Sequence, residues 1–291
     1  SSGDLELATE IFARTVELGR QTWPEHHPQI AFMVGGLGSM KRRSGDFDEA
    51  RRLYDEKTES TRIVMGEESI DYVSALRARG FLLIDMAKYA EAEDSFRDAL
   101  ELLARLDALD HYHYPVVNVG IGMTLNRRGR FAEAEQQFME ALKNRDRMST
   151  TTQHITQSEL AEATSGQGRT SEAETLFSDT LQDTREQVGD DSLTLTRQLI
   201  RIAVHYRQKG DLEAARRYID DAVRIADANW PRSNWSSALI HAELGSILVA
   251  QGDRVAGRRE LEAAASALEE VFGQDDPRVI ASREELSRIL K

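Results

Sequence analysis

The 291-residue chain contains no cysteine and no long apolar run, and it has fewer basic than acidic residues. The absence of cysteine excludes disulfides, thiolate catalysis and cysteine metal sites, and is compatible with a reducing compartment. No apolar run reaches the roughly 18 residues that a membrane-spanning helix needs, and the first residues lack a signal-peptide pattern. These absences favour a soluble, cytoplasmic protein without a membrane partner.

The net charge of −13 argues against a nucleic-acid partner, because the overall field would repel a phosphate backbone unless a basic face were segregated. Hydrophobic residues make up 40% and charged residues 30% of the chain, which is an ordinary globular balance. Only six of the 37 basic residues are lysine. Arginine offers a planar fork of donors that suits carboxylates.

One sequence motif recurs along the chain: "KYAEAEDSFRDAL" begins at Lys88, "RRGRFAEAEQQFMEAL" at Arg127 and "RTSEAETLFSDTL" at Arg169. Its small anchor residue returns in steps of 42, 42, 42, 39, 42 and 42 residues. The anchors are Ala8, Ala50, Ala92, Ala134, Ala173, Ala215 and Gly257. Five residues before the anchors stand Gly3, Gly45, Ala87, Gly129, Gly168, Gly210 and Gly252, and four residues after them stand Phe12, Tyr54, Phe96, Phe138, Phe177, Ile219 and Leu261.

These columns predict a helix hairpin in each repeat. A small residue twelve positions before the anchor would let the first helix approach the second closely, while the bulky residue after the anchor fills the space beside them. The glycine column predicts a turn between the two helices. Polar links carrying Pro115 and Pro277 precede new helices. The sequence therefore predicts an all-α fold, an α-solenoid of about six full hairpins with single helices at both ends.

The pattern resembles the tetratricopeptide repeat family. The matching features are "LGSM" from Leu37 with Ala50 and Tyr54, and "RIAVHY" from Arg201 with Ala215. The repeat of about 34 residues in that family is lengthened here to 42. The longer repeat, with links such as "VFGQDDPRV", is similar to the kinesin light chain subgroup. This resemblance implies a right-handed superhelix of antiparallel hairpins.

The register predicts a single array over residues 1–291. A lone second helix is expected over 4–22, repeats over about 29–64, 70–108, 115–147, 151–188, 192–228 and 235–272, and a capping helix over 277–290. The hairpin partner of the first helix would precede residue 1. We therefore expect this array to be a module cut from a longer polypeptide, with a possible upstream domain.

A groove formed by the first helices of the repeats is the expected binding surface, because function in solenoids is carried by such surfaces. The stripe that points away from each hairpin is more apolar than a solvent face should be. The candidate groove residues are Phe32, Arg42, Arg77, Phe81, Ile84, Val119, Met123, Asn126, Arg127, Arg197, Arg201 and Arg207. Two interpretations stay open: the apolar members pack against the neighbouring first helix, or they form the floor for a peptide with an apolar anchor and a carboxylate.

Two details qualify the groove. The basic residues Arg197, Arg201 and Arg207 either bind a carboxylate or pair with neighbouring acids at a solvated edge. The asparagine pair that clamps peptide backbones in long-repeat relatives is missing, so recognition of the kinesin type is not expected. Gly35, Gly36 and Gly120 indicate extra space or close backbone approach in the N-terminal half.

No catalytic, metal or cofactor site is predicted. "GGLGSM" and "GIGMTL" are not phosphate-binding loops, because both fall on the small-residue column of a helix. The pairs His26–His27 and His111–His113 lie in links without further ligand spacing. We therefore expect a non-enzymatic scaffold that binds a protein or peptide with apolar and acidic features. The alternative is a peptide-sensing switch that changes superhelical pitch to control an attached catalytic or DNA-binding domain.

Overall fold

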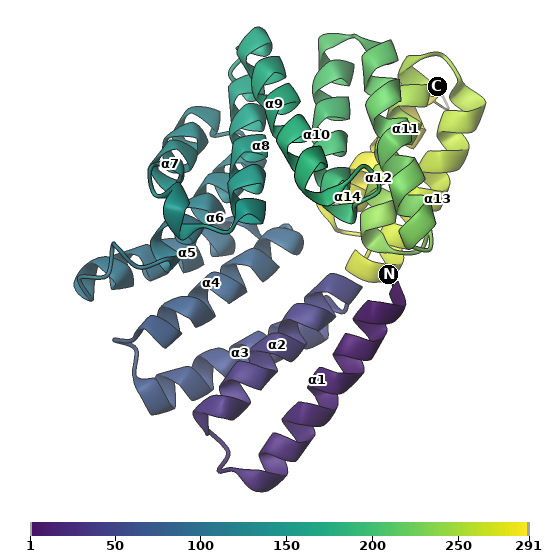
Figure 1. The fold of residues 1–291 in the computed structure, drawn as a ribbon. Helices are drawn as coiled ribbons and strands as arrows, with labels where there is room; N and C mark the ends of the chain where they lie inside the picture. The colour runs from purple at the N-terminus through teal and green to yellow at the C-terminus, as the bar shows by residue number, and fades with distance from the viewer. Residues whose placement is uncertain (1, 290–291) are drawn as a thin grey trace. The chain divides into compact units, whose positions relative to one another are not determined.

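The computed structural model describes residues 2–289, and over that range it consists of helices without a strand (Figure 1). The helices are α1 (Ser2–Thr22), α2 (Pro28–Ser44), α3 (Phe47–Met65), α4 (Ile70–Asp85), α5 (Tyr89–Arg105), α6 (His113–Arg127), α7 (Phe131–Lys143), a 3₁₀ turn η1 (Arg145–Arg147), α8 (Thr150–Gly166), α9 (Thr170–Val188), α10 (Leu193–Lys209), α11 (Leu212–Asn229), α12 (Trp235–Ala250), α13 (Arg254–Phe272) and α14 (Pro277–Ile289). None of these helices has the length and apolarity required to cross a membrane. The predicted all-α class is confirmed.

The chain divides into two compact units, Ser1–Gln167 and Gly168–Lys291. In unit 1, helices α2 and α3, α4 and α5, and α6 and α7 pack as hairpins. In unit 2 the hairpins are α10 with α11 and α12 with α13, and α14 packs on α13. The predicted helix pairing is therefore confirmed within each unit.

Helix starts follow a local rule that the sequence carries. The odd-numbered helices α3, α11 and α13 are capped by Asp46, Asp211 and Asp253, whose side chains accept backbone N–H groups of the first turn. Even-numbered helices begin in the links, where Ser69 caps α4 and Asn234 caps α12. These caps satisfy backbone donors that a helix leaves unpaired at its start.

The glycine column forms left-handed turns, as predicted. Gly45, Gly129 and Gly210 have φ of 89°, 72° and 87°, a region that residues with a Cβ rarely adopt. Ala87 takes the same conformation with φ of 57°, although it carries a Cβ. Gly3 is an exception to the prediction, because it lies within α1 and not at a turn.

The small-residue column makes room for aromatic rings. A Cβ built on Gly80 would lie 2.7 Å from the ring of Phe96, and one on Gly122 would lie 2.5 Å from the ring of Phe138. Outside this column, a Cβ built on Gly120 of the next hairpin would lie 2.4 Å from the ring of Phe96. Both rings are fully buried. Gly35, Gly36 and Gly120 were predicted to give either extra space or a close approach to the backbone. The structure shows a close approach, because a Cβ on Gly36 would lie 2.4 Å from the ring of Phe12.

Gly120→Ala is expected to lower the free energy of unfolding by about 1–3 kcal/mol, since overpacking against Phe96 outweighs the better helix propensity of alanine. Urea unfolding followed by far-ultraviolet circular dichroism measures this. Phe96→Leu leaves a void that the new methyl group can enter. The double variant should therefore be less destabilised than the sum of the single changes, and strict additivity would contradict the proposed clash.

The even-numbered helices also pack on one another within each unit. Helix α4 contacts both α2 and α6, and α6 contacts α8; in unit 2, α12 contacts both α10 and α14. The even-numbered helices therefore form one continuous layer in each unit. The 39-residue step arises in α7, which has 13 residues and is followed by η1, whereas α3 and α9 have 19.

Candidate functional site

Four of the predicted groove residues are buried and do not line an open surface. Ile84, Val119, Met123 and Asn126 are 8%, 2%, 7% and 4% exposed. The first three belong to the core cluster that joins α4, α5, α6 and α7. The expectation that they are presented to a partner is corrected: neighbouring even-numbered helices bury them, which is the packing interpretation of the stripe.

Two arginines of the predicted groove are held by carboxylates of the next even-numbered helix. In unit 1, Arg127 on α6 binds Glu162 at 2.5 Å and Glu159 at 3.3 Å, both on α8. In unit 2, Arg207 on α10 donates to both carboxylate oxygens of Glu243 on α12, at 2.6 and 3.1 Å. Burial raises the pKa of Glu243, and the guanidinium of Arg207 opposes that effect. These arginines join adjacent repeats.

Arg197 and Arg201 on α10 are the other two basic residues that were predicted for the groove in unit 2. Arg197 is exposed and Arg201 is partly buried. A guanidinium nitrogen of Arg201 donates to the carbonyl oxygen of Arg197 at 3.3 Å. Of the two interpretations of this basic patch, pairing with a neighbouring acid is the one found at Arg207.

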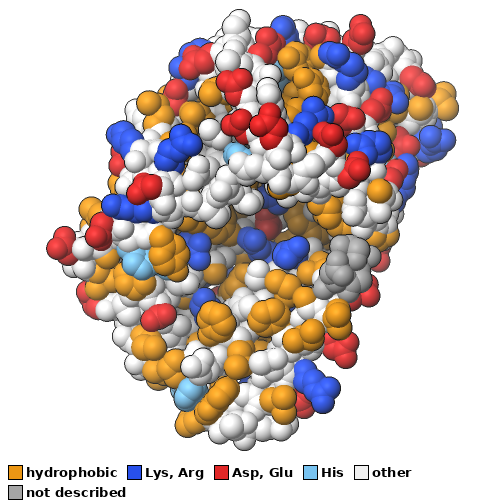
Figure 2. Space-filling view, in the orientation of Figure 1, with side chains coloured by type: hydrophobic (Ala, Val, Ile, Leu, Met, Phe, Trp, Pro, Cys, Tyr) orange, Lys and Arg blue, Asp and Glu red, His pale blue; other side chains and the backbone are white. Residues whose placement is uncertain are grey.

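Phe32 and Phe81 differ in accessibility. Phe32 on α2 is 74% exposed, an unusual state for a phenylalanine. Phe81 on α4 is partly buried and packs edge to face on Phe96, with ring centroids 5.0 Å apart. Hydrophobic side chains gather over α2 and α4 on the face seen in Figure 2, with Lys and Arg side chains beside them. Phe32 is therefore the accessible apolar anchor among the predicted residues.

Within residues 2–289, no carboxylate forms an ion pair with Arg77 on α4. Its side chain is partly buried, and its Nε atom is buried without a hydrogen bond. We define the Arg77 cluster as Lys57, Arg77 and His113, three basic side chains that lie close enough to perturb one another. Burial lowers the pKa of Arg77, while Tyr112 and Tyr54 oppose this effect and the charge of Arg42 adds to it. Arg42 itself is paired with Asp85 at 3.6 Å.

Lys57 reaches this cluster across its own hairpin. It lies on α3, yet a Cβ built on Gly35 of α2 would be 2.8 Å from its Cδ and 3.2 Å from its Nζ. The absence of a side chain at position 35 therefore lets the lysine stem lie directly on the α2 backbone. Burial lowers the pKa of Lys57, and the positive charge of Arg77 lowers it further. Asp71 opposes this shift only weakly.

His113, at the start of α6, completes the cluster. It is 1% exposed and packs on the rings of Tyr112 and His111, with centroid distances of 4.1 and 4.9 Å. Burial, together with the charges of Arg77, His111 and Lys57, lowers its pKa to about 3. Its Nδ1 atom is buried without a hydrogen-bond partner. The ring is therefore neutral at physiological pH.

Sequence reasoning identified Arg77 but missed Lys57 and His113 as its neighbours. One signal was present in the sequence. The positions three and four residues away from Lys57 and from Arg77 carry no acid, whereas Arg97 has Glu93 and Arg105 has Glu101 at that spacing. A basic residue without such a neighbour must find its counter-ion elsewhere or remain unpaired.

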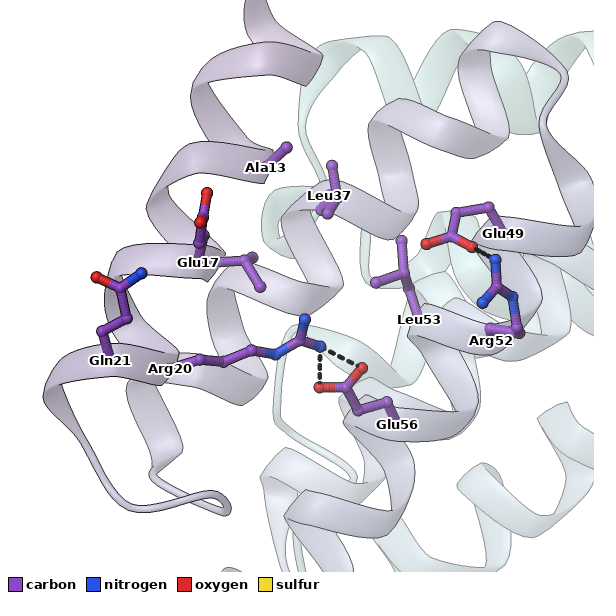
Figure 3. Close-up of a pocket in the computed structure, with 10 residues that line it drawn as sticks. Ala13, Glu17, Arg20, Gln21, Leu37, Glu49, Arg52, Leu53 and Glu56 are labelled. Carbon is purple, nitrogen blue, oxygen red and sulfur yellow. Dashed lines mark hydrogen bonds and ion pairs between the residues drawn. The ribbon is translucent and has the colours of Figure 1, made fainter.

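A surface pocket of about 460 Å³ lies between α1, α2 and α3 (Figure 3). Arg20 on α1 binds both carboxylate oxygens of Glu56 on α3, at 2.6 and 2.7 Å, and Arg52 binds Glu49. Four of the five charged residues that line this pocket thus form two ion pairs, and the fifth is Glu17. Most of its lining residues lie on α1 and α3, which are not part of the layer of even-numbered helices.

The histidine pairs do not assemble a metal centre. Within the described residues, no three His, Asp or Glu side chains come together as metal ligands would. His27 caps α2 by accepting the backbone N–H of Gln29, and His26 lies 3.3 Å from the hydroxyl of Ser60. Both pairs have local structural contacts.

The repeated hairpins and the layer of even-numbered helices match known proteins. Residues 71–147 match the tetratricopeptide repeat family. The fold is a tetratricopeptide-type α-solenoid. No curated protein sequence matches the chain.

Three solved structures illustrate this similarity in fold. The Rap conjugation gene regulator of plasmid pLS20, in complex with the Phr* peptide, aligns with a TM-score of 0.71 and 15% identity over 95% of this chain and 72% of its own. NprR in complex with its cognate peptide NprX aligns with a TM-score of 0.68 and 14% identity, over 98% and 79%. A kinesin light chain repeat protein of Podosopora anserina gives 0.51 and 14%, over 68% and 96%.

Proposed function

We propose that this protein is a non-catalytic scaffold that binds a peptide or a protein segment and regulates a partner through that binding. The observation that carries the proposal is the Arg77 cluster, in which the partly buried Lys57 and Arg77 and the fully buried His113 form no ion pair with any carboxylate of the described residues. An unpaired basic site is a local positive region that favours an acidic ligand, against the long-range repulsion of a chain with net charge −13. The structures of NprR and of the pLS20 Rap regulator, each solved with a peptide, support the same reading.

The partner that suits this surface carries an apolar residue and a carboxylate. Phe32 supplies an exposed aromatic anchor on α2, and Arg77 on α4 supplies the charge. Helices α2 and α4 pack directly against each other, so both residues belong to one layer. Aromatic and arginine side chains commonly dominate binding energy at interfaces. The regulated partner is either a separate protein or a further domain of the same polypeptide in the cytoplasm.

A peptide-sensing switch is the second candidate. The division of the chain into two compact units at Gln167 and Gly168 favours it, since two units joined by one turn can respond to a ligand by reorienting. Small-angle X-ray scattering with and without a bound peptide separates the candidates. A change in the radius of gyration on binding supports the switch, and an unchanged value supports the scaffold.

A peptide-array screen tests the proposed function, with binders quantified by fluorescence anisotropy. Peptides that contain an apolar residue and an acid are expected to bind the wild-type chain and to bind the Arg77→Glu variant at least about 10-fold more weakly, the loss expected for a charge-assisted contact. Phe32→Ala should weaken the same peptides. Arg79→Gln is the matched control, because Arg79 lies two residues along α4 and is 3.9 Å from Asp55. A screen without charge-sensitive binders contradicts the proposal.

A further inference from the structure

We infer that Lys57 and Arg77, with the buried ring of His113 behind them, form a binding site for one carboxylate group. The choice of a peptide as the source of that carboxylate rests on the function proposed above, whereas the anion site is argued from the side chains alone. The site draws on three elements, α3, α4 and α6, and no carboxylate of the described residues forms a hydrogen bond or ion pair with these three side chains.

The comparison with other partly buried arginines shows how unusual Arg77 is. Arg127 makes contacts of 2.5 and 3.3 Å with two glutamates, and Arg207 makes contacts of 2.6 and 3.1 Å with one. Arg77 occupies the same layer of even-numbered helices without such a partner, and its Nε atom is buried and unpaired. A buried cation needs a counter-charge, because desolvation otherwise disfavours it.

The three basic groups also act against one another. The charge of Arg77 lowers the pKa of Lys57, and both charges lower the pKa of His113. An arrangement that concentrates positive charge without an ion-paired acid costs stability in the free protein. A bound anion removes that cost, because it supplies the missing charge to Lys57 and Arg77 together.

Two cations of the cluster are available to a ligand. Within the described residues, Lys57 and Arg77 form no ion pair with an acid, whereas the nearby Arg42 is paired with Asp85 at 3.6 Å. His113 is neutral and adds no charge. A guanidinium fork can donate two hydrogen bonds to one carboxylate, and a carboxylate is the acidic group of an unmodified peptide, the ligand class proposed above.

Competitive acetylation of the lysines provides a direct test on the full chain. The chain has only six lysines, so mass spectrometry can follow each amine separately. Lys143 is bonded to Glu140 and Lys209 to Glu174, and both pairs raise the lysine pKa. At pH 7.5 and constant ionic strength, Lys57 should react with trace acetic anhydride faster than these two amines. Succinate is the first probe: it should protect Lys57 in a saturable way and leave Lys88 unprotected.

Two variants assign the protection to the site. In Arg77→Gln the concentration of succinate that gives half-protection should rise at least 10-fold, and in Arg79→Gln it should stay within twofold of wild type. Equal protection in wild type and Arg77→Gln overturns the inference, as does the absence of protection at Lys57. Sulfate and phosphate form the second arm, and tighter binding of either than of succinate overturns the assignment to a carboxylate.

Peptide probes identify the source of the carboxylate. Binders from the array are prepared with a free C-terminus, with a C-terminal amide, and with each acidic side chain replaced by its amide. Loss of at least 10-fold in affinity on one of these changes, absent in Arg77→Gln, supports the inference. Peptides that bind wild type and Arg77→Gln equally, without any succinate protection, overturn the anion site but leave the proposed function intact. Succinate protection without any peptide binder supports the anion site and contradicts the proposed function.

Discussion

Replacement of Arg127 by methionine is expected to lower the free energy of unfolding by about 3–5 kcal/mol, the usual cost of removing one partner of a buried ion pair. The side chain of Glu159 is 0% exposed, and its Oε1 atom lies 3.3 Å from the guanidinium of Arg127. Without that guanidinium, the carboxylate is buried with much weaker compensation. The Asn126 amide still donates to Glu159, at 2.9 Å to its carbonyl oxygen and 3.2 Å to Oε2, but carries no charge.

A double-mutant cycle isolates the pair. Because an apolar pair of similar volume can replace a buried ion pair at little cost, Arg127→Met with Glu159→Met should recover most of the stability lost in Arg127→Met alone. Urea unfolding monitored by circular dichroism gives the free energies. Arg258→Met is the control, since its partner Glu262 is half exposed and the expected loss is below about 1 kcal/mol. A double variant as unstable as the sum of its parts would contradict the buried-pair explanation.

This pair also shows where sequence reasoning reached its limit. Arg127 was predicted to flank the apolar stripe of the groove, and the structure shows it in contact with two carboxylates of α8. Its partners Glu159 and Glu162 come from the next repeat, across the one shortened step of the array, where α7 has only 13 residues. The alignment of α6 with α8 depends on that shortened connection, so a column of residues could not reveal which acids would face Arg127.

The fold was predictable because its determinants are local and repeated. Close packing of a glycine against an aromatic ring occurs at Gly80 with Phe96 and at Gly122 with Phe138, and in both cases the two residues belong to one hairpin. Left-handed turns at Gly45 and Gly210 likewise need information from a few residues only. Agreement of several such columns over six copies specifies the hairpins.

The Arg77 cluster was only partly predictable, because its members come from different classes of element. Arg77 lies on the predicted stripe, but Lys57 extends from the second helix of the preceding hairpin past Gly35. His113 was expected in a link and instead begins α6, fully buried. Which long side chain passes over a neighbouring helix is decided by three-dimensional packing and not by a one-dimensional period.

His113 is expected to make the protein acid-sensitive. Its pKa in the folded protein is about 3, below the ordinary value of 6.5 that applies to the unfolded chain. The neutral ring therefore contributes stability that is fully present above about pH 6.5 and is lost as the pH falls toward 3. The slope is about 1.4 kcal/mol per pH unit, which gives a loss of about 3 kcal/mol by pH 4.

His113→Phe keeps a ring in this packed site but cannot take up a proton. The variant should therefore lose less stability than wild type between pH 6.5 and pH 4, by about 3 kcal/mol, when urea unfolding is measured across that range. Carboxylates such as Glu93 also contribute to acid unfolding. Burial raises the pKa of Glu93, but hydrogen bonds from Arg97 and the charges of nearby arginines lower it by a larger amount, and this contribution is the same in both proteins and cancels in the difference.

His111→Phe serves as the control, because it leaves His113 in place and should retain most of the acid sensitivity. Arg77→Gln should lie between wild type and His113→Phe, since it removes one of the charges that disfavour protonation of His113. Identical profiles for wild type and His113→Phe would show that the ring does not carry this linkage, and an unchanged profile in Arg77→Gln would remove Arg77 from the set of charges that act on it.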